Sequence, residues 1–269
     1  MNKIEQQMVE ILLVLKHTYG AVSVKAEFEA EGTRLEELLR LVDVGRSASL
    51  AITVKIGGCE AIRDLLEAKQ IGCKYIVAPM VETPYAASKF LEAKDHVYSK
   101  DEEESTGFLF NLETITGYNN RQGLLDVTNV GRGLDGVVLG RHDFVLSMDL
   151  PVSAINSQEV TDQVLEVSKL CREYNKDLVV GGGMSGESIT GLKEIAKIRL
   201  DRFETRKIIF DAKAALETDI EKGLMEAVYF EYLWLVNKRH YYKNISEEDV
   251  KRIKHFESRL NITAQNSLY

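Results

Sequence analysis

The sequence predicts an α/β protein with a parallel β-sheet, best matched by a barrel, followed by a C-terminal helical extension. Short apolar segments alternate with amphipathic helical segments between residues 21 and 210. The apolar segments are nearly continuous, which is typical of strands that helices cover on both faces. The length of 269 residues is also close to the roughly 250 residues of one α/β barrel.

Seven strands are expected in this part of the chain. The helices between them carry ordinary end signals, because Thr33 suits an N-cap, Gly72 a C-terminal stop and Pro84 a first helical turn. The expected strands are residues 21–28, 50–56, 74–80, 106–112, 135–140, 177–180 and 202–210. The expected helices include residues 34–44, 59–72, 158–174 and 187–198, with a short helix between residues 115 and 133.

Seven strands are one fewer than a closed eight-stranded barrel requires. The first 20 residues have a helical pattern, so we expect either a short strand among them or a barrel with an atypical first strand. A doubly wound sheet would accept seven strands, but it usually has a glycine-rich nucleotide loop after its first strand, and none is present. The glycines at 181–183 lack the spacing of such a loop.

The chain changes character at Ala212. Residues 212–244 form a long helical pattern rich in aromatic residues, and Ser246 is expected to begin a second helix as its N-cap. We therefore divide the chain into a barrel at residues 1–211 and a helical extension at residues 212–269. The extension is expected to pack on the barrel or on a neighbouring subunit, which predicts a homo-oligomer formed through the C-terminal helices.

The composition excludes several classes of protein. Acidic residues outnumber basic ones by 42 to 34, giving a net charge of −8 that disfavours a nucleic-acid-binding surface. Three widely spaced cysteines make neither a disulfide framework nor a zinc motif. No apolar run approaches the roughly 18 residues of a membrane span, and the N-terminus lacks the cleavage site of a signal peptide. A soluble cytoplasmic protein without nucleic-acid or membrane partners is expected.

Polar residues at the ends of the expected strands are the candidates for chemistry, since parallel strands end at one edge of a sheet. Glu113 and Asp143 follow successive strands, and two carboxylates there suit Mg²⁺ or Mn²⁺. Lys55 ends the second strand and is placed to meet an anionic substrate or an enolate. The other strand-end candidates are Glu27, Glu29, Glu31, Glu82, Thr83, Asn111, Arg141, His142, Ser185, Glu187, Glu204 and Arg206.

Three ordered segments resemble a known family. Residues 53–87 (TVKIGGCEAIRDLLEAKQIGCKYIVAPMVETPYAA), 108–118 (FLFNLETITGY) and 134–150 (LDGVVLGRHDFVLSMDL) are similar to motifs of the HpcH/HpaI aldolase and citrate lyase family. The resemblance spans roughly residues 21–210. It implies a TIM (β/α)8 barrel of the phosphoenolpyruvate/pyruvate type that makes or cleaves a carbon–carbon bond through a metal-stabilised enolate.

The resemblance also implies roles for single residues. Glu113 and Asp143 would bind Mg²⁺ or Mn²⁺, and Asn111 stands where the aldolases have a glutamine near pyruvate. The backbone N–H groups of His142 and Asp143 would receive the pyruvate carboxylate. Lys55 replaces the family's arginine, which keeps the charge but loses the planar fork.

The general base is a point of departure from the family. Ala30 stands where the aldolases carry a histidine, so Glu29, Glu31 or His142 is expected to supply this function.

These observations favour a class II, metal-dependent aldolase or carbon–carbon lyase that acts on pyruvate or a related 2-oxo acid, with an aldehyde as partner. One alternative is a lyase or transferase that uses phosphoenolpyruvate or acyl-CoA, for which Arg202, Arg206 and Lys207 would supply a basic patch. Another is a non-catalytic barrel that binds an oxo acid.

Overall fold

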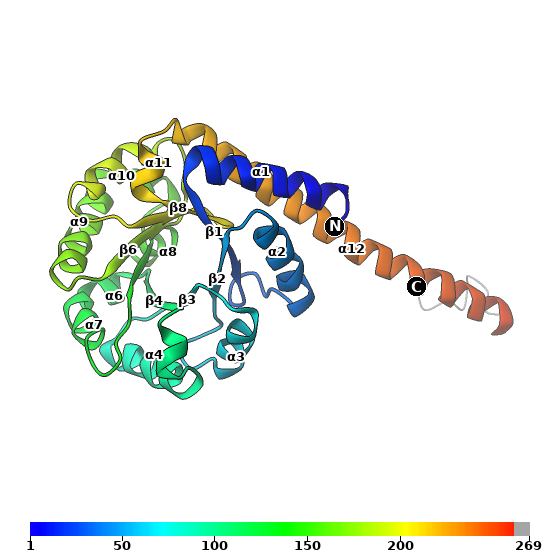
Figure 1. Cartoon of the computed structure of the whole chain (residues 1–269), viewed down its shortest axis with the longest axis horizontal. Coiled ribbons are helices and arrows are strands. Elements are labelled where there is room, and N and C mark those ends of the chain that lie inside the picture. Colours follow the sequence, from blue (N-terminus) through cyan, green and yellow to red (C-terminus); the bar gives the residue numbers. More distant parts are fainter. Residues whose placement is uncertain (261–269) are drawn as a thin grey trace.

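The computed structural model describes residues 1–260 and shows a closed barrel of eight strands surrounded by helices (Figure 1). This confirms the (β/α)8-type barrel that the sequence predicts. The strands are β1 (Ala21–Glu27), β2 (Ala51–Lys55), β3 (Tyr75–Ala78), β4 (Gly107–Leu112), β5 (Gly136–Gly140), β6 (Asp177–Gly181), β7 (Arg202–Glu204) and β8 (Ile208–Asp211).

The helices follow the strands in the expected alternation, with several short additions. Residues 100–103 form one turn of helix, and two short helices replace the one expected between residues 115 and 133. The helices are α1 (Lys3–Tyr19), α2 (Leu35–Ser47), α3 (Ile62–Ile71), α4 (Pro84–Val97), α5 (Lys100–Glu103), α6 (Ile115–Asn119), α7 (Arg121–Val127), α8 (Arg141–Ser147), the 3-10 helix η1 (Val152–Asn156), α9 (Gln158–Glu173), α10 (Ser188–Ala196), α11 (Ala212–Leu216) and α12 (Ile220–Leu260).

The eighth strand comes from the end of the barrel sequence and not from its beginning. The first residues form α1, and the single strand expected at 202–210 is instead the hairpin of β7 and β8. The hairpin turns at Thr205, whose N–H donates to the Ile208 carbonyl at 2.9 Å, with Arg206 and Lys207 between. Strand β8 is therefore antiparallel to both of its neighbours, whereas the other seven strands are parallel.

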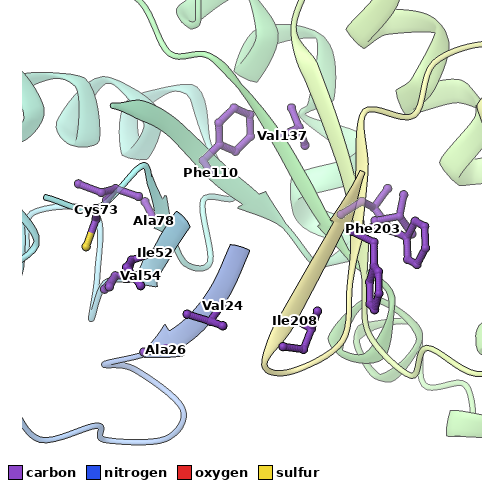
Figure 2. Close-up of a cluster of buried hydrophobic side chains, with 14 of the residues drawn as sticks. Val24, Ala26, Ile52, Val54, Cys73, Ala78, Phe110, Val137, Phe203 and Ile208 are labelled. Carbon is purple, nitrogen blue, oxygen red and sulfur yellow. The ribbon is translucent and has the colours of Figure 1, made fainter. Parts of the chain in front are cut away.

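Alternate residues of each strand face opposite sides of the barrel wall. The outward side chains pack against the helices in the large hydrophobic core, part of which Figure 2 shows. A smaller apolar cluster, formed by Val77, Leu109, Val138 and Val179 from β3 to β6, fills the barrel interior. The outward set of strand residues includes Val24, Ala26, Ile52, Val54, Phe110, Val137 and Phe203.

Helix α12 is a single helix of 41 residues, about 60 Å long at 1.5 Å per residue. The second helix expected to begin at Ser246 is therefore wrong, because the helix continues through that residue. Its first half packs along α1, and its second half extends away from the barrel (Figure 1). The last residues of the predicted extension, 261–269, lie outside the described residues. The domain division at residue 211 stays a prediction.

Among residues 1–260, no helix is both long and apolar enough to cross a membrane.

Candidate active site

The strand alternation sends polar side chains into the barrel at the carboxyl ends of the strands. On β1, Lys25 lies between the outward residues Val24 and Ala26, and Glu27 follows Ala26; on β2, Lys55 follows Val54. The strands are thus not apolar on both faces near their ends, which refines the pattern expected from the sequence. The polar ends of β1, β2, β4 and β7 create one cavity.

This mouth cavity has a volume of about 390 Å³. Its wall comes from the barrel strands, the loops that follow them, and one turn of α12. The lining residues are Lys25, Glu27, Glu29, Ala30, Lys55, Asn111, Glu113, Val138, Gly140, His142, Asp143, Gly181, Gly182, Gly183, Met184, Glu204, Thr205, Arg206, Val228 and Glu231.

The first lysine cluster of the cavity is formed by Lys55, Glu29 and Glu113. The Lys55 Nζ atom lies 3.2 Å from Glu29 Oε2 and 3.4 Å from Glu113 Oε2. Glu113 is only 3% exposed, and its other oxygen accepts the Met80 backbone N–H at 2.9 Å. Asn111 donates its amide N–H to Glu113 Oε2. Both oxygens of the Glu113 carboxylate are therefore engaged.

The second lysine cluster is formed by Lys25, Glu27 and Glu204. The Lys25 Nζ atom lies 3.0 Å from Glu27 Oε1 and also contacts Glu204 Oε1. Burial alone would lower the pKa of Lys25, but the charges of Glu204 and Glu27 outweigh burial and raise it. Burial likewise tends to raise the pKa of Glu27, and the Lys25 ammonium lowers it below its ordinary value. Lys25 and Glu27 are therefore held in their charged forms near neutral pH.

Two glycines form the floor between these clusters. Gly140 of β5 and Gly181 of β6 are partners in the sheet register. A Cβ atom on Gly140 would lie 3.0 Å from Glu113 Oε2, and one on Gly181 would lie 3.0 Å from Glu204 Cγ. Side chains here would crowd both carboxylates, so the glycines keep the floor of the cavity open.

The outer rim is formed by the β7–β8 turn and α12. Arg206 is half exposed and lies 3.6 Å from Glu27 Oε2 and 3.8 Å from Glu231 Oε1 of α12. Burial raises the pKa of Glu231, and Arg206 opposes that effect. Lys207 is buried and paired with Glu31, and Arg202 is paired with Asp177 Oδ2 at 2.7 Å. Arg202, Arg206 and Lys207 are thus each paired with a carboxylate. The basic patch considered for acyl-CoA therefore does not form from these three residues.

The predicted site residues converge on this cavity. Lys55, Glu29, Asn111, Glu113, His142 and Asp143 all line it, as does Ala30. His142 and Asp143 lie at the start of α8, where both side chains are about half exposed and their Nδ1 and Oδ1 atoms are 3.4 Å apart. The strand-end residues Glu82, Thr83, Ser185 and Glu187 do not line the cavity.

Several lining residues had no predicted role in the aldolase site. Glu27 and Glu204 were recognisable as polar strand ends, but nothing in the sequence distinguished them from solvated charges, and Arg206 was considered only for the acyl-CoA alternative. Lys25 lies inside a strand, where the alternation with Val24 and Ala26 was the available signal. Glu231 gave no signal, because it belongs to a helix that reaches the mouth only in the folded chain.

A hard divalent cation fits the donor chemistry of the cavity. Glu113 and Asp143 supply carboxylates, and Asn111 supplies an amide oxygen that is buried and has no hydrogen-bond partner among the described residues. Within residues 1–260 there is no group of three or more His, Cys, Asp or Glu side chains placed to hold a metal ion. A cation would therefore depend on two carboxylates, this amide, water and substrate oxygens.

A second cavity of about 450 Å³ lies between the beginnings of α1 and α2 and the middle of α12. Its buried carboxylates already have partners. Glu5 accepts from Arg40 Nε at 3.0 Å and from Asn237 Nδ2 at 3.1 Å, and Glu37 accepts from the Tyr242 hydroxyl at 2.6 Å. These contacts join α12 to α1 and α2, and we assign the cluster to packing.

Solved structures show the same fold. An HpcH/HpaI aldolase from Desulfitobacterium hafniense matches with a TM-score of 0.59 and 13% identity, over 81% of this chain and 87% of that one. A family protein from Burkholderia cenocepacia matches with 0.58 and 12%, over 88% and 100%. A variant of the citrate synthase SbnG matches with 0.52 and 14%, over 91% and 90%. At these identities the likeness concerns the fold alone.

The sequence comparisons place the chain in a family. No curated protein matches it. Residues 20–181, which include strands β1 to β6 and their loops, match the family described as HpcH/HpaI aldolase/citrate lyase. The chain therefore belongs to the HpcH/HpaI aldolase/citrate lyase family, and its barrel is that of a lyase or aldolase of this superfamily.

Proposed function

We propose that this protein is a divalent-metal-dependent carbon–carbon lyase or aldolase that acts on pyruvate or a related 2-oxo acid through an enolate. The observation that carries the proposal is the convergence of Glu113, Asp143, Asn111 and Lys55 on one cavity at the carboxyl ends of the strands. The set combines oxygen ligands for Mg²⁺ or Mn²⁺ with one ammonium group. When bound, such a cation would polarise the oxo acid and lower the energy of its enolate.

The residues of the chain have distinct proposed tasks. Lys55 is buried beside Glu113 and supplies positive charge where an enolate oxygen would develop. Asn111 and the backbone N–H groups of His142 and Asp143 would orient the oxo acid and its carboxylate. Glu29 and His142 lie at the more exposed part of the cavity, with Glu29 33% exposed, and would exchange protons with the oxygen of the aldehyde partner.

Isotope exchange tests this function without knowledge of the aldehyde. The protein is incubated with Mg²⁺ and pyruvate in D₂O, and loss of the methyl signal is followed by proton NMR. Exchange is expected for the wild type. Binding of Mg²⁺ and of pyruvate, measured by calorimetry, is expected to weaken at least tenfold in Glu113→Gln, because the buried carboxylate loses its charge.

The matched control is Glu166→Gln. Glu166 is a glutamate held by Lys169 on the outer face of α9, at 2.6 Å, and its loss should change neither binding nor exchange. Unaltered binding of Mg²⁺ and pyruvate in Glu113→Gln would contradict the site assignment. Measurable cleavage of a 4-hydroxy-2-oxo acid would eliminate the non-catalytic alternative.

Two further expectations extend to assembly and location. We propose that the projecting half of α12 binds a second copy of the chain, since it carries exposed Tyr241, Ile245, Ile253 and Phe256 and since most helical stability in proteins comes from tertiary packing. Light scattering after size exclusion should show a dimer or larger, and Ile253→Glu with Phe256→Glu should yield a monomer. A monomeric wild type would contradict this. The cytoplasmic location stays a prediction.

A further inference from the structure

Arg141 is the one buried cation among residues 1–260 that has no carboxylate partner. It is 5% exposed and makes no ion pair within that range. Each of the other buried cations contacts at least one carboxylate, and these are Lys25, Lys55, Lys94 and Lys207. A buried charge is costly unless a charge of opposite sign accompanies it. The surroundings of Arg141 therefore favour the binding of a further negative charge nearby.

The guanidinium of Arg141 lies directly behind the wall of the mouth cavity. Its Nε and Nη2 atoms donate to the carbonyl oxygens of Gly181 and Gly182, at 3.3 Å and 3.0 Å. Both glycines line the cavity, and Arg141 itself does not. Its other oxygen partners, Asn156 Oδ1 at 3.1 Å and Ser188 Oγ at 3.2 Å, are also uncharged. A charge held away from solvent, one peptide group from the cavity, is only weakly screened.

The same wall lies against the residues proposed to receive the carboxylate of the oxo acid. A Cβ atom on Gly182 would lie 2.5 Å from the backbone nitrogen of His142 and 2.8 Å from that of Arg141. Only glycine allows so close an approach, and Gly182 has a φ of +82°, in the left-handed region. The guanidinium, the two carbonyl groups that it binds and the backbone at His142 are thus contiguous at this side of the cavity.

The basic residues that line the cavity are already compensated. The lining residues carry six carboxylates but three basic side chains, those of Lys25, Lys55 and Arg206. Lys25 and Lys55 each contact two glutamates, and Arg206 lies near Glu27 and Glu231. A cavity with an excess of carboxylates repels an anionic substrate. An oxo acid therefore needs positive charge besides these three side chains.

We propose that Arg141 is a positioning residue whose charge attracts the carboxylate of the bound 2-oxo acid to the wall formed by Gly181 and Gly182. This inference rests on the proposed function. Arg141 does not touch the substrate. It acts from behind the two carbonyl groups, whose oxygens are directed at the guanidinium. The carboxylate supplies the counter-charge that Arg141 lacks, while Lys55 acts on the carbonyl end of the same molecule.

The test compares a charged ligand with an uncharged one in Arg141→Gln, which removes the charge and keeps an N–H donor. The Kd for pyruvate with Mg²⁺, measured by calorimetry, is expected to rise at least about tenfold. The Kd for pyruvamide, which has a similar shape without the negative charge, is expected to change less than about threefold. Mg²⁺ alone should bind no more weakly than to the wild type, because a repelling cation is lost.

Arg199→Gln is the matched control. Arg199 is partly buried but is paired with Asp177 and Asp201, where β6 and β7 begin. Its loss should lower stability and leave the ratio of the pyruvate and pyruvamide Kd values unchanged. Circular dichroism and urea unfolding establish that each variant is folded. Arg141→Met is a second neutral variant should the glutamine variant not fold, and the same ratio is expected.

Arg141→Lys keeps the charge and should bind pyruvate within about fivefold of the wild type. A lysine variant as weak as the neutral variants would overturn the role of the charge. An equal rise in both Kd values, or a wild-type Kd for pyruvate in Arg141→Gln, would also overturn the role of Arg141 and leave the proposed function intact. A wild type that binds Mg²⁺ but not pyruvate would overturn both.

Discussion

Two lysines of the barrel mouth each lie between two glutamates, but the two clusters differ in burial and in what they leave free. Lys25 and both of its partners, Glu27 and Glu204, are buried. Lys55 is equally buried, yet its partner Glu29 is 33% exposed and reaches water. The same three-charge arrangement thus occurs once inside the barrel wall and once open to solvent.

The two clusters also differ in how many carboxylate oxygens have hydrogen-bond partners. In the Lys55 cluster, Glu113 is fully engaged by Lys55, Asn111 and the Met80 N–H. In the Lys25 cluster, Glu204 Oε2 is buried and has no hydrogen-bond partner among the described residues. Identical residue types are therefore paired differently in the two clusters, because neighbouring backbone and solvent access differ.

The largest effect is expected from Lys25→Met. This change leaves Glu27 and Glu204 buried without their shared cation, and we expect a loss of about 3–5 kcal/mol in the free energy of unfolding. Urea unfolding measures it. Adding Glu204→Gln should restore part of the loss, since one buried charge is then removed. A double variant as unstable as the sum of the single changes would show that the cluster is not coupled.

Lys55→Met should cost less stability, about 2 kcal/mol. Glu29 can turn to water, and Glu113 keeps the Met80 N–H and Asn111 as donors. The same urea experiment gives the value. A loss equal to that of Lys25→Met would remove the distinction between the two clusters. Mg²⁺ affinity in Lys55→Met should increase, because the competing ammonium no longer occupies Glu113, and calorimetry detects this change.

Substitutions of the floor glycines Gly140 and Gly181 should have smaller effects on stability than the lysine substitutions. Gly181→Ala places a methyl 3.0 Å from Glu204 Cγ, and Gly140→Ala places one 3.0 Å from Glu113 Cβ. Each should cost about 1 kcal/mol by overpacking. Gly181→Ala is expected to leave Mg²⁺ affinity unchanged, whereas Gly140→Ala should weaken Mg²⁺ binding, because only Gly140 adjoins the proposed ligand Glu113. The reverse pattern would contradict the assignment of the cation to the Glu113 side of the cavity.

The smallest effect concerns pH. Burial tends to raise the pKa of Glu27, but Lys25 lowers it below the ordinary 4.5, so its contribution to stability is present above pH 4.5 and is lost as pH falls through the lower folded value. Lys25 has a raised pKa, and its contribution is lost only in alkaline solution. Urea unfolding between pH 5 and 3 should show a shallower decline for Glu27→Gln than for the wild type. Equal slopes would contradict this pairing.

The strand ends of the site could be predicted because parallel strands share one edge. Lys55, Asn111, Glu113 and Asp143 needed only the strand boundaries to be placed together. The β7–β8 hairpin could not be predicted in the same way. Its turn at Thr205, Arg206 and Lys207 contains none of the glycine, proline or asparagine that usually marks a turn.

Helix α12 shows the opposite error, in which the sequence contains a signal for a helix start that the structure does not use. Ser246 with the following glutamates matches an N-cap signal, yet no glycine or proline stands before it to end the preceding helix, so the helix continues. Its contribution of Glu231 to the cavity depends on contact with Arg206, which lies 25 residues earlier (231 − 206) on the hairpin.

The sequence by itself determined the barrel, the family and the residues at the ends of the parallel strands, because hydrophobic period and strand order are local properties. Only the tertiary structure decided which charges meet. It returned the last strand antiparallel to close the barrel, brought α12 to the rim, and left one oxygen of Glu204 without a partner within residues 1–260. Burial and pairing depend on residues distant in the chain, so no local pattern contains them.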